Sequence, residues 1–167
     1  MSGPRGAPQG PRAATGFVSG ATPPGPNRFH ATVIPSAIGV MSTSEATTQG
    51  IRVQVESRFS AENSRPEQWF FLYTVRISNQ GSETVQLTSR HWIIRDANDQ
   101  IEEVKGPGVV GDQPVLEPGD SYEYTSGCPL PTPFGSMQGS YQMVTAGGEH
   151  FDAEIAEFVL REPGSIH

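Results

Sequence analysis

Apolar and polar side chains alternate with a period of two along several short segments of this chain. The alternation is clearest at Ile51, Val53 and Val55, which polar residues separate. The segment Trp69–Ser78 begins apolar on both faces and then alternates. Successive side chains of a strand point to opposite faces, so this period predicts half-buried β-strands. The long segment Trp69–Ser78 is the best candidate for a central strand.

The same pattern predicts further strands at 84–88, 90–95, 101–105, 121–126, 137–145 and 151–160. Turn-forming residues separate them, for example at 79–82, 118–120 and 146–149. No window carries a helical stripe, and no segment repeats. Seven to eight short strands with frequent turns predict an all-β fold, a β-sandwich of immunoglobulin or fibronectin type III style.

The first part of the chain has a different composition. Residues 1–50 hold seven prolines and eight glycines without any sustained period. Such a segment buries too little apolar surface to offset its ordering entropy. We therefore predict a disordered extension over residues 1–45 and a β-sandwich domain over 46–167. Two alternatives stay open, namely that residues 29–38 dock locally and that the native chain starts at Met41.

Charge and cysteine content restrict the class of protein further. Residues 1–50 carry three arginines against Glu45, whereas the remaining residues carry 8 basic and 17 acidic side chains, a net charge of −9. An acidic domain repels phosphate backbones, so we expect no nucleic-acid binding. A single cysteine excludes an intrachain disulfide, and neither a secretory signal nor a membrane-spanning run is recognisable. We expect a soluble cytoplasmic protein without a membrane partner.

Three runs of unusual residues carry a resemblance to a known family. The runs SRHWIIRDAN, VKGPGVVGDQPVLEPGDSYEYTSGCPL and GSMQGSYQM resemble the bacterial ApaG family, and the resemblance extends over residues 50–160. Asp99 departs from it, because the family often has glycine at that place in the turn. Aspartate also tolerates left-handed geometry, so only the turn type is in question.

The resemblance implies a fibronectin type III-like β-sandwich in the cytoplasm with no established enzymatic activity and no cofactor. The family's genes are often linked with a dinucleoside tetraphosphatase and are associated with cobalt and magnesium resistance. Its domain also occurs inside eukaryotic F-box and polymerase-associated proteins, which suggests protein–protein interaction.

One glycine motif suggests an anion site. Gly106, Gly108 and Gly111 spell G-x-G-x-x-G, but a β segment follows where a dinucleotide-binding site needs a helix. A glycine-rich loop can still form a nest of backbone amides for a phosphate or pyrophosphate. Arg90, His91 and Lys105 could add positive charge. The simpler interpretation is that the loop needs glycine for its backbone angles.

Other candidate residues have competing structural interpretations. Arg90, His91 and Trp92 could form part of a protein interface, although Trp92 fits better as a core tryptophan. A metal site is not favoured, because the acidic residues near 96–103 break the calcium-loop spacing and His91 and His150 are far apart. Cys128 could be a nucleophile, but a quiet structural thiol fits better.

These observations predict a non-enzymatic binding module for protein interaction or regulation, with an unidentified protein partner. The alternative is a sensor of pyrophosphate or a nucleotide that is associated with divalent cation tolerance. The candidate anion- or partner-binding residues are Arg90, His91, Trp92, Lys105, Gly106, Gly108 and Gly111.

Overall fold

The computed structural model describes residues 41–164, and these form two antiparallel sheets. Most of the predicted extension therefore lies outside the described residues. The elements are β1 (Ser42–Thr48), β2 (Ile51–Phe59), a 3-10 turn η2 (Ala61–Asn63), β3 (Trp69–Asn79), β4 (Val85–Asp96), β5 (Ile101–Pro107), β6 (Val115–Leu116), β7 (Ser121–Leu130), β8 (Phe134–Thr145) and β9 (His150–Arg161).

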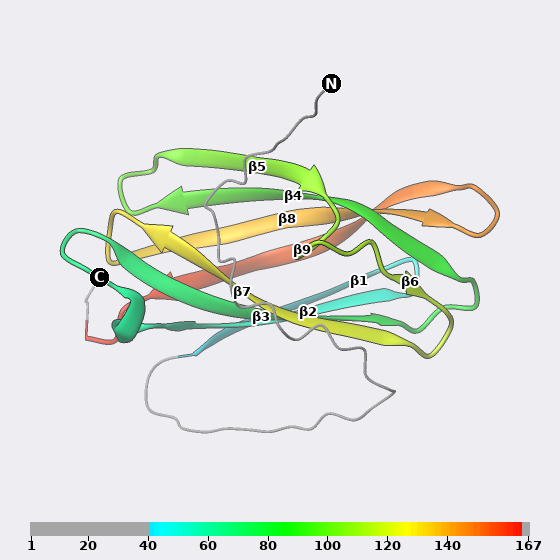
Figure 1. Ribbon diagram of the computed structural model, residues 1–167, viewed down its shortest axis with the longest axis horizontal. Helices are drawn as coiled ribbons and strands as arrows, with labels where there is room; N and C mark the ends of the chain where they lie inside the picture. The colour runs from blue at the N-terminus through cyan, green and yellow to red at the C-terminus, as the bar shows by residue number, and fades with distance from the viewer. Residues whose placement is uncertain (1–40, 165–167) are drawn as a thin grey trace.

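The two sheets stack as the layers of a sandwich (Figure 1). The first has the strand order β1-β2-β3-β7, and the second has the order β5-β4-β8-β9 with β6 paired to the start of β4. The predicted all-β sandwich is thus confirmed. The segment 69–78 is an interior strand, since β3 pairs with both β2 and β7. No helix among residues 41–164 is long and apolar enough to cross a membrane.

Two sequence predictions need correction. The predicted strands 84–88 and 90–95 are one continuous strand, β4, whose register with β8 shifts between Leu87 and Ser89. A bulge of this kind interrupts the alternation of side chains and makes one strand resemble two. The predicted boundary at residue 45 falls inside β1, which begins at Ser42.

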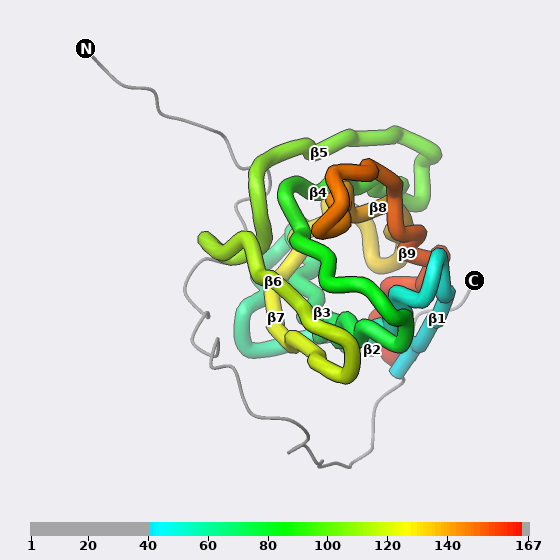
Figure 2. The backbone as a smooth tube through the Cα atoms, turned by 90° about the vertical axis from the view of Figure 1, so that its right-hand side faces the viewer, coloured from blue at the N-terminus to red at the C-terminus, as the bar shows by residue number. Residues whose placement is uncertain are grey.

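The two sides of the sandwich differ (Figure 2). On one side β9 lies beside β1, so the two sheets meet. On the other side β5 and β7 are the edge strands, and the segment after β5 crosses from one sheet to the other. Because the edges of a sheet expose unpaired backbone groups, the two sides differ in the hydrogen-bonding groups that they present.

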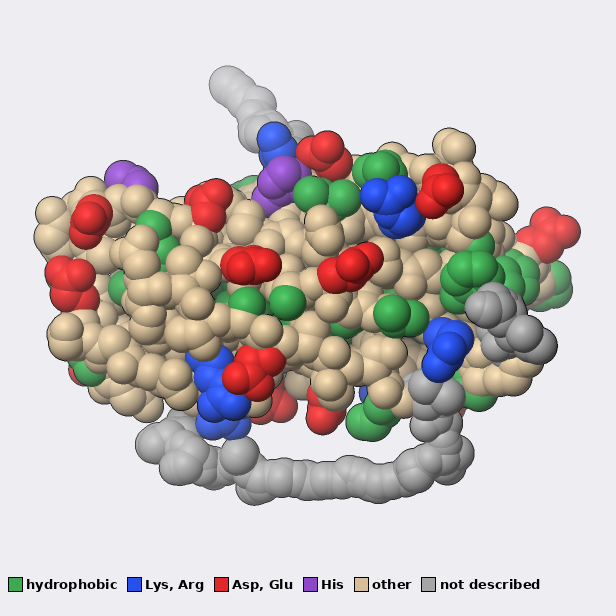
Figure 3. Space-filling view, turned by 180° about the vertical axis from the view of Figure 1, so that it is seen from behind, with side chains coloured by type: hydrophobic (Ala, Val, Ile, Leu, Met, Phe, Trp, Pro, Cys, Tyr) green, Lys and Arg blue, Asp and Glu red, His purple; other side chains and the backbone are tan. Residues whose placement is uncertain are grey.

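On the side where β1 lies beside β9, side-chain hydroxyls of the first sheet hydrogen-bond to the backbone of β9. Ser44 and Ser57 donate to the carbonyls of Ala156 and Val159, both at 2.8 Å, and the amide of Glu154 donates to the Thr48 hydroxyl at 3.1 Å. Three backbone groups of β9 thereby form hydrogen bonds with side chains of the opposite sheet. The face seen from behind in Figure 3 carries Asp and Glu side chains spread singly across its middle.

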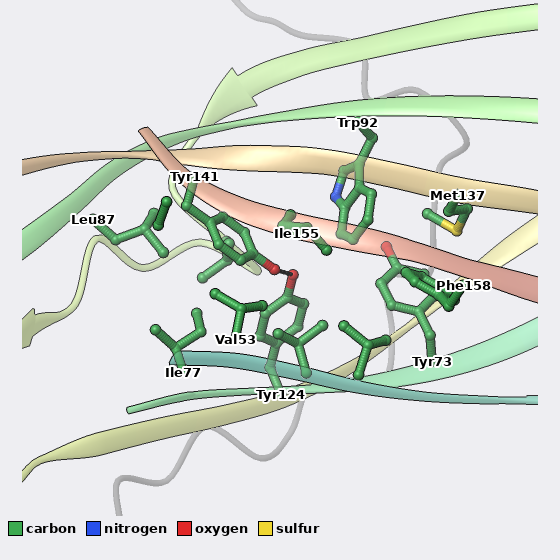
Figure 4. Close-up of a cluster of buried hydrophobic side chains, with 14 of the residues drawn as sticks. Val53, Tyr73, Ile77, Leu87, Trp92, Tyr124, Met137, Tyr141, Ile155 and Phe158 are labelled. Atoms are coloured by element: carbon green, nitrogen blue, oxygen red, sulfur yellow. Dashed lines mark hydrogen bonds between the residues drawn. The ribbon is translucent and has the colours of Figure 1, made fainter. Parts of the chain in front are cut away.

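The core lies between the sheets and is rich in aromatic side chains. Trp92 of β4 packs edge-on against Tyr73, Tyr141 and Phe158, with ring centroids 5.3, 6.3 and 6.0 Å away. The hydroxyls of Tyr124 and Tyr141 meet across the two sheets among aliphatic side chains (Figure 4). Trp92 is 3% exposed. It is therefore the core tryptophan rather than a surface contact.

Candidate functional site

Arg90 enters the interior of the sandwich from β4. It pairs in register with Gly106 on one side and Tyr141 on the other, and it lies on the same strand face as the buried Trp92. Its Nη1 donates to the carbonyls of Pro107 at 3.1 Å and Gly108 at 2.9 Å. The guanidinium thus passes below β5 and binds the carbonyls of the loop that follows it.

Gly106 lies close against the Arg90 side chain. A Cβ at Gly106 would lie 3.2 Å from both terminal nitrogens of the guanidinium. That distance is shorter than ordinary van der Waals contact, so a larger residue would require the guanidinium to shift by a few tenths of an ångström. The first glycine of the motif therefore has a packing role.

The rest of the glycine motif forms a tight turn. The amides of Val109 and Asp112 donate to each other's carbonyls at 2.8 Å, which closes a two-residue hairpin loop. Its two central residues, Val110 and Gly111, have φ of 38° and 86°. Two positive φ values define a type I′ turn, which normally takes Asn-Gly.

Val110 is an unusual residue for the first central position of this turn. A β-branched side chain is strained at positive φ, at a cost of about 1–3 kcal/mol. The Val110 side chain is also 40% exposed, so no burial of apolar surface compensates fully for that cost. Val115, shortly after the turn, is 55% exposed. The segment therefore presents two aliphatic side chains to solvent.

The turn is attached to the start of β7. The hydroxyl of Tyr122, on the inward face of β7, donates to Asp112 Oδ2 at 2.8 Å. Burial raises the pKa of Tyr122 above its ordinary value, and the hydrogen bond to the Asp112 carboxylate raises it further. The phenol therefore remains a donor, and the exposed tip at Val110 has a fixed position beside the edge strand β7.

The outer edge of β7 is not paired with any other strand of residues 41–164. Asn79 donates to the carbonyl of Asp120 at 2.9 Å, so the odd-numbered residues of β3 pair through hydrogen bonds with β7. Hydrogen-bonded and non-hydrogen-bonded pairs alternate in an antiparallel ladder. The partners of the even-numbered residues of β3 therefore direct their amides and carbonyls away from the sheet. Within residues 41–164 no strand pairs with this edge, which presents Ser121, Glu123, Thr125 and Gly127.

The strand β5 borders the same side from the other sheet. Glu102 pairs with Ile94 and shares its inward face, yet Glu102 is exposed whereas Ile94 is 5% exposed. No strand of the described chain covers this carboxylate from below.

Burial raises the pKa of the Cys128 thiol of β7 to about 12, and the negative charge of Glu102 adds to this shift. The thiol is protonated and 1% exposed, as expected of a structural cysteine.

His91 and Lys105 lie on the outer face of the second sheet. They are register partners on β4 and β5, one residue out of phase with the inward-facing Arg90 and Gly106. His91 Nε2 is 2.9 Å from Glu103 Oε1. The predicted residues thus fall into two groups on opposite faces of the sheet. Arg90, Gly106 and Gly108 meet inside, whereas His91 and Lys105 lie outside.

The acidic residues near 96–103 form a turn. Asp96 Oδ1 accepts from the amides of Asn98 and Gln100 at 2.7 and 3.1 Å, and Arg95 contacts Asp99 at 3.4 Å. Asp99 has φ of 65°, the left-handed geometry that the family often assigns to glycine. Over the described part of the chain, no three His, Cys, Asp or Glu side chains cluster so that they could hold a metal ion.

Two features of this site were not predicted from the sequence. The strain at Val110 could have been suspected, because Val-Gly stands where a type I′ turn favours Asn-Gly, but the pattern does not reveal that a two-residue loop forms here. The open edge of β7 carries no signal of its own, since Tyr122 and Tyr124 alternate as in a fully paired strand. The site is therefore larger than the predicted glycine loop and includes β7.

This fold and site define a class of protein, a two-sheet β-sandwich with a glycine-rich turn beside an open edge strand. Comparison with known proteins gives the family. The family model described as the ApaG domain matches residues 59–145. The chain belongs to the ApaG family, and the resemblance predicted from the three sequence runs is confirmed.

Relatives and solved structures agree with this assignment. Protein ApaG of Anaeromyxobacter sp. (strain K) is 57% identical over 124 residues, which cover 74% of this chain and 99% of the relative. Protein ApaG of Methylorubrum populi is 60% identical over 121 residues, 71% of this chain and 93% of the relative. A structure described as an ApaA protein from Bordetella pertussis is 51% identical with a TM-score of 0.67, and it covers 69% of this chain and 95% of that chain. A structural genomics X-ray structure is 45% identical with a TM-score of 0.68, covering 73% and 94%.

Proposed function

We propose that this ApaG domain is a protein-interaction module that acts by binding rather than by catalysis. The observation that carries the proposal is the exposed Val110 at a strained turn position. Backbone strain persists where the surrounding structure enforces it, and it concentrates at functional sites. An asparagine would adopt the same geometry with less strain, so valine at this position lowers the stability of the turn. Val110 and Val115 give a partner two exposed aliphatic side chains to bury at a turn of fixed geometry.

The position of the turn supports the same proposal. The hydrogen bond between Tyr122 and Asp112 holds the turn beside the open edge of β7. A partner that contacts Val110 can therefore reach unpaired backbone groups of β7 in the same approach. Main-chain hydrogen bonds to an edge strand are a common way for a domain to bind a peptide segment.

The alternative of an anion sensor has less support. Arg90 Nη1 donates to the loop carbonyls of Pro107 and Gly108, so this nitrogen is already engaged in hydrogen bonds. The amide of Gly108 donates to the Thr88 carbonyl at 2.9 Å, and the amides of Val109 and Asp112 bond within the turn. A nest for phosphate needs such amides to be free and convergent. Divalent cation tolerance and a cytoplasmic location remain proposals that follow from the family resemblance.

The proposal is tested by crosslinking from two matched positions. A photoreactive phenylalanine analogue is introduced in cells at Val110 and, in a second variant, at Val159 of β9, a valine that is 44% exposed and lies away from the turn. We expect a protein crosslink from position 110 and none from position 159. The crosslinked protein is then purified and its affinity measured for the wild type, Val110→Asn and Val159→Asn.

The expected result is a separation of stability from binding. Val110→Asn should increase the free energy of unfolding by about 1 kcal/mol, because strain at positive φ is relieved, while it weakens partner binding at least about tenfold, a loss of about 1.4 kcal/mol. Val159→Asn should leave the affinity unchanged. Equal crosslinks from both positions, or unchanged affinity of Val110→Asn for the crosslinked protein, would contradict the proposal.

A further inference from the structure

From the open side of the sandwich we infer the kind of partner that binds, namely an extended protein segment carrying alternate apolar and basic residues, which adds as a strand to the outer edge of β7. This inference rests on the proposed function and deepens it. It names the strand that is contacted, the backbone atoms involved and the chemistry of the partner.

The backbone of β7 provides the first argument. The alternation of the β3–β7 ladder directs the amides and carbonyls of Glu123, Thr125 and Gly127 away from the sheet. Pro129 continues this series, and it lacks only an amide that would point outward. An incoming strand can therefore form a regular ladder with β7 from residue 121 to residue 127, where the outward amides end, without breaking any bond to β3.

The other sheet edges are less suited to an added strand. The backbone of β9 is capped by the hydroxyls of Ser44, Thr48 and Ser57. The strand β5 ends at Pro107, whose carbonyl accepts from Arg90, and it carries the inward-facing carboxylate of Glu102. An inward-pointing charge is a device that prevents edge pairing.

The strand β1, at the far edge of the same sheet as β7, offers no apolar contact. Its inward positions hold small or hydroxyl-bearing residues, Ser42, Ser44, Ala46 and Thr48. By contrast, the inward face of β7 carries Tyr122, Tyr124 and Cys128. Apolar side chains on the inward face of an added strand would lie beside these residues and extend the core. The edge of β7 therefore gives both hydrogen bonds and apolar contact.

Charge indicates which segment fits. Residues 41–164 contain 8 Lys and Arg against 18 Asp and Glu, a difference of −10. On the outer face of β7, Glu123 is 54% exposed and lies 3.9 Å from Arg76. Basic side chains on the outer face of a partner strand would meet the carboxylate of Glu123, whereas two copies of this acidic domain would repel each other.

The test uses a pair of matched substitutions. Thr43, Glu56, Thr74 and Thr125 form one cross-strand row, so Thr43 and Thr125 are the same residue type at the two opposite edges of one sheet. Thr125→Pro removes an outward amide and leaves the ladder to β3 intact, and Thr43→Pro does the same on β1. Because Thr125 also shares a hydroxyl hydrogen bond with Thr74 at 2.8 Å, Thr125→Val serves as a second control that keeps the amide.

The probes are labelled synthetic decapeptides with alternating lysine and valine, alternating glutamate and valine, and a lysine–valine peptide methylated on alternate backbone amides. Binding is measured by fluorescence anisotropy on the full chain, with folding verified by circular dichroism. We expect saturable binding of the lysine–valine peptide only. Thr125→Pro should weaken that binding at least about tenfold, a loss of about 1.4 kcal/mol, whereas Thr43→Pro and Thr125→Val should bind as the wild type does.

Several outcomes would overturn the inference. Equal binding of the methylated peptide, or of the glutamate peptide, would exclude strand addition or the charge preference. Unchanged binding by Thr125→Pro would exclude the β7 edge. Self-association of the wild type that Thr125→Pro abolishes, seen by sedimentation, would assign the edge to a second copy of this chain instead. If the partner crosslinked at Val110 loses affinity for Val110→Asn but not for Thr125→Pro, the proposed function stands and this inference falls.

Discussion

The hydroxyls of Tyr124 and Tyr141 form a hydrogen bond across the two sheets of the sandwich, in the middle of the core. Tyr124 comes from β7 and Tyr141 from β8, and the exposed fractions of the two residues are 6% and 0%. Aliphatic side chains surround the pair (Figure 4). Each hydroxyl is therefore the main polar neighbour of the other, and the pair fixes how the open-edge sheet sits on the opposite sheet.

Removing both hydroxyls of this pair should cost less than the two single removals added together. Tyr141→Phe or Tyr124→Phe leaves the remaining buried hydroxyl without its partner, which costs about 1–3 kcal/mol. In the double variant neither hydroxyl is left, so its loss should be well below the sum of the single losses. Urea unfolding of the wild type, both single variants and the double variant gives the coupling energy. Additive losses would show that the hydrogen bond contributes nothing to stability.

The tyrosines should also make the fold sensitive to alkali. The protein has 4 tyrosines, and burial is the main cause that raises the pKa of each one, Tyr73, Tyr122, Tyr124 and Tyr141. Above the unfolded-state pKa of about 10, the unfolded chain loses phenol protons that the folded chain retains, so stability falls as pH rises. Below that pH this contribution is fully present. We expect phenolate absorbance to appear together with loss of the β-sheet circular dichroism signal. Phenolate formation near pH 10 (about the ordinary pKa) in a folded protein would contradict this.

The strands could be predicted where burial follows the two-residue period. Val53 and Val75 are inward-facing and 0% exposed, and their alternation with polar residues placed β2 and β3 correctly. The strand β1 was missed because its inward positions are occupied by Ser44 and Thr48, whose hydroxyls cap β9 rather than fill the core. A strand whose inward side chains hydrogen-bond to the backbone of another strand has no hydrophobic period, so pattern analysis does not detect it.

The site could be predicted only in part. The glycines of the 106–111 segment were identified, but their pattern does not distinguish a nest for an anion from a passage for an arginine side chain. That distinction depends on Arg90, which comes from another strand and reaches the carbonyls of Pro107 and Gly108. Likewise, the sequence of β7 does not say whether one or both of its edges are paired, because edge position is a property of the sheet.

A close approach of two strands makes Gly139 a sensitive position. A Cβ at Gly139 of β8 would lie 2.0 Å from the carbonyl oxygen of His91 on β4. Backbone cannot give way as a flexible side chain can, so Gly139→Ala should separate the two strands and lower the free energy of unfolding by about 3 kcal/mol or more. Gly81→Ala is the matched control, since its nearest contact is an ordinary 3.4 Å. Thermal unfolding of both variants makes the comparison, and equal melting temperatures would refute the predicted clash.

Arg90 should stabilise the glycine turn rather than bind a ligand. Its two hydrogen bonds to Pro107 and Gly108 hold the end of β5, and hydrogen bonds from a charged group contribute about 1.5–3 kcal/mol. Arg90→Met keeps much of the apolar stem and removes the donors, so it should lower the free energy of unfolding by about that amount.

Hydrogen exchange locates the effect of this substitution. The amide of Gly108, which donates to the Thr88 carbonyl, should exchange faster in Arg90→Met, whereas the amide of Gln80, which donates to Gly50 on the other sheet, should keep its wild-type rate. Pyrophosphate added to the wild type should leave both exchange rates unchanged. Protection of the 106–112 amides by pyrophosphate in the wild type, lost in Arg90→Met, would instead restore the anion-sensor alternative and assign Arg90 to the ligand.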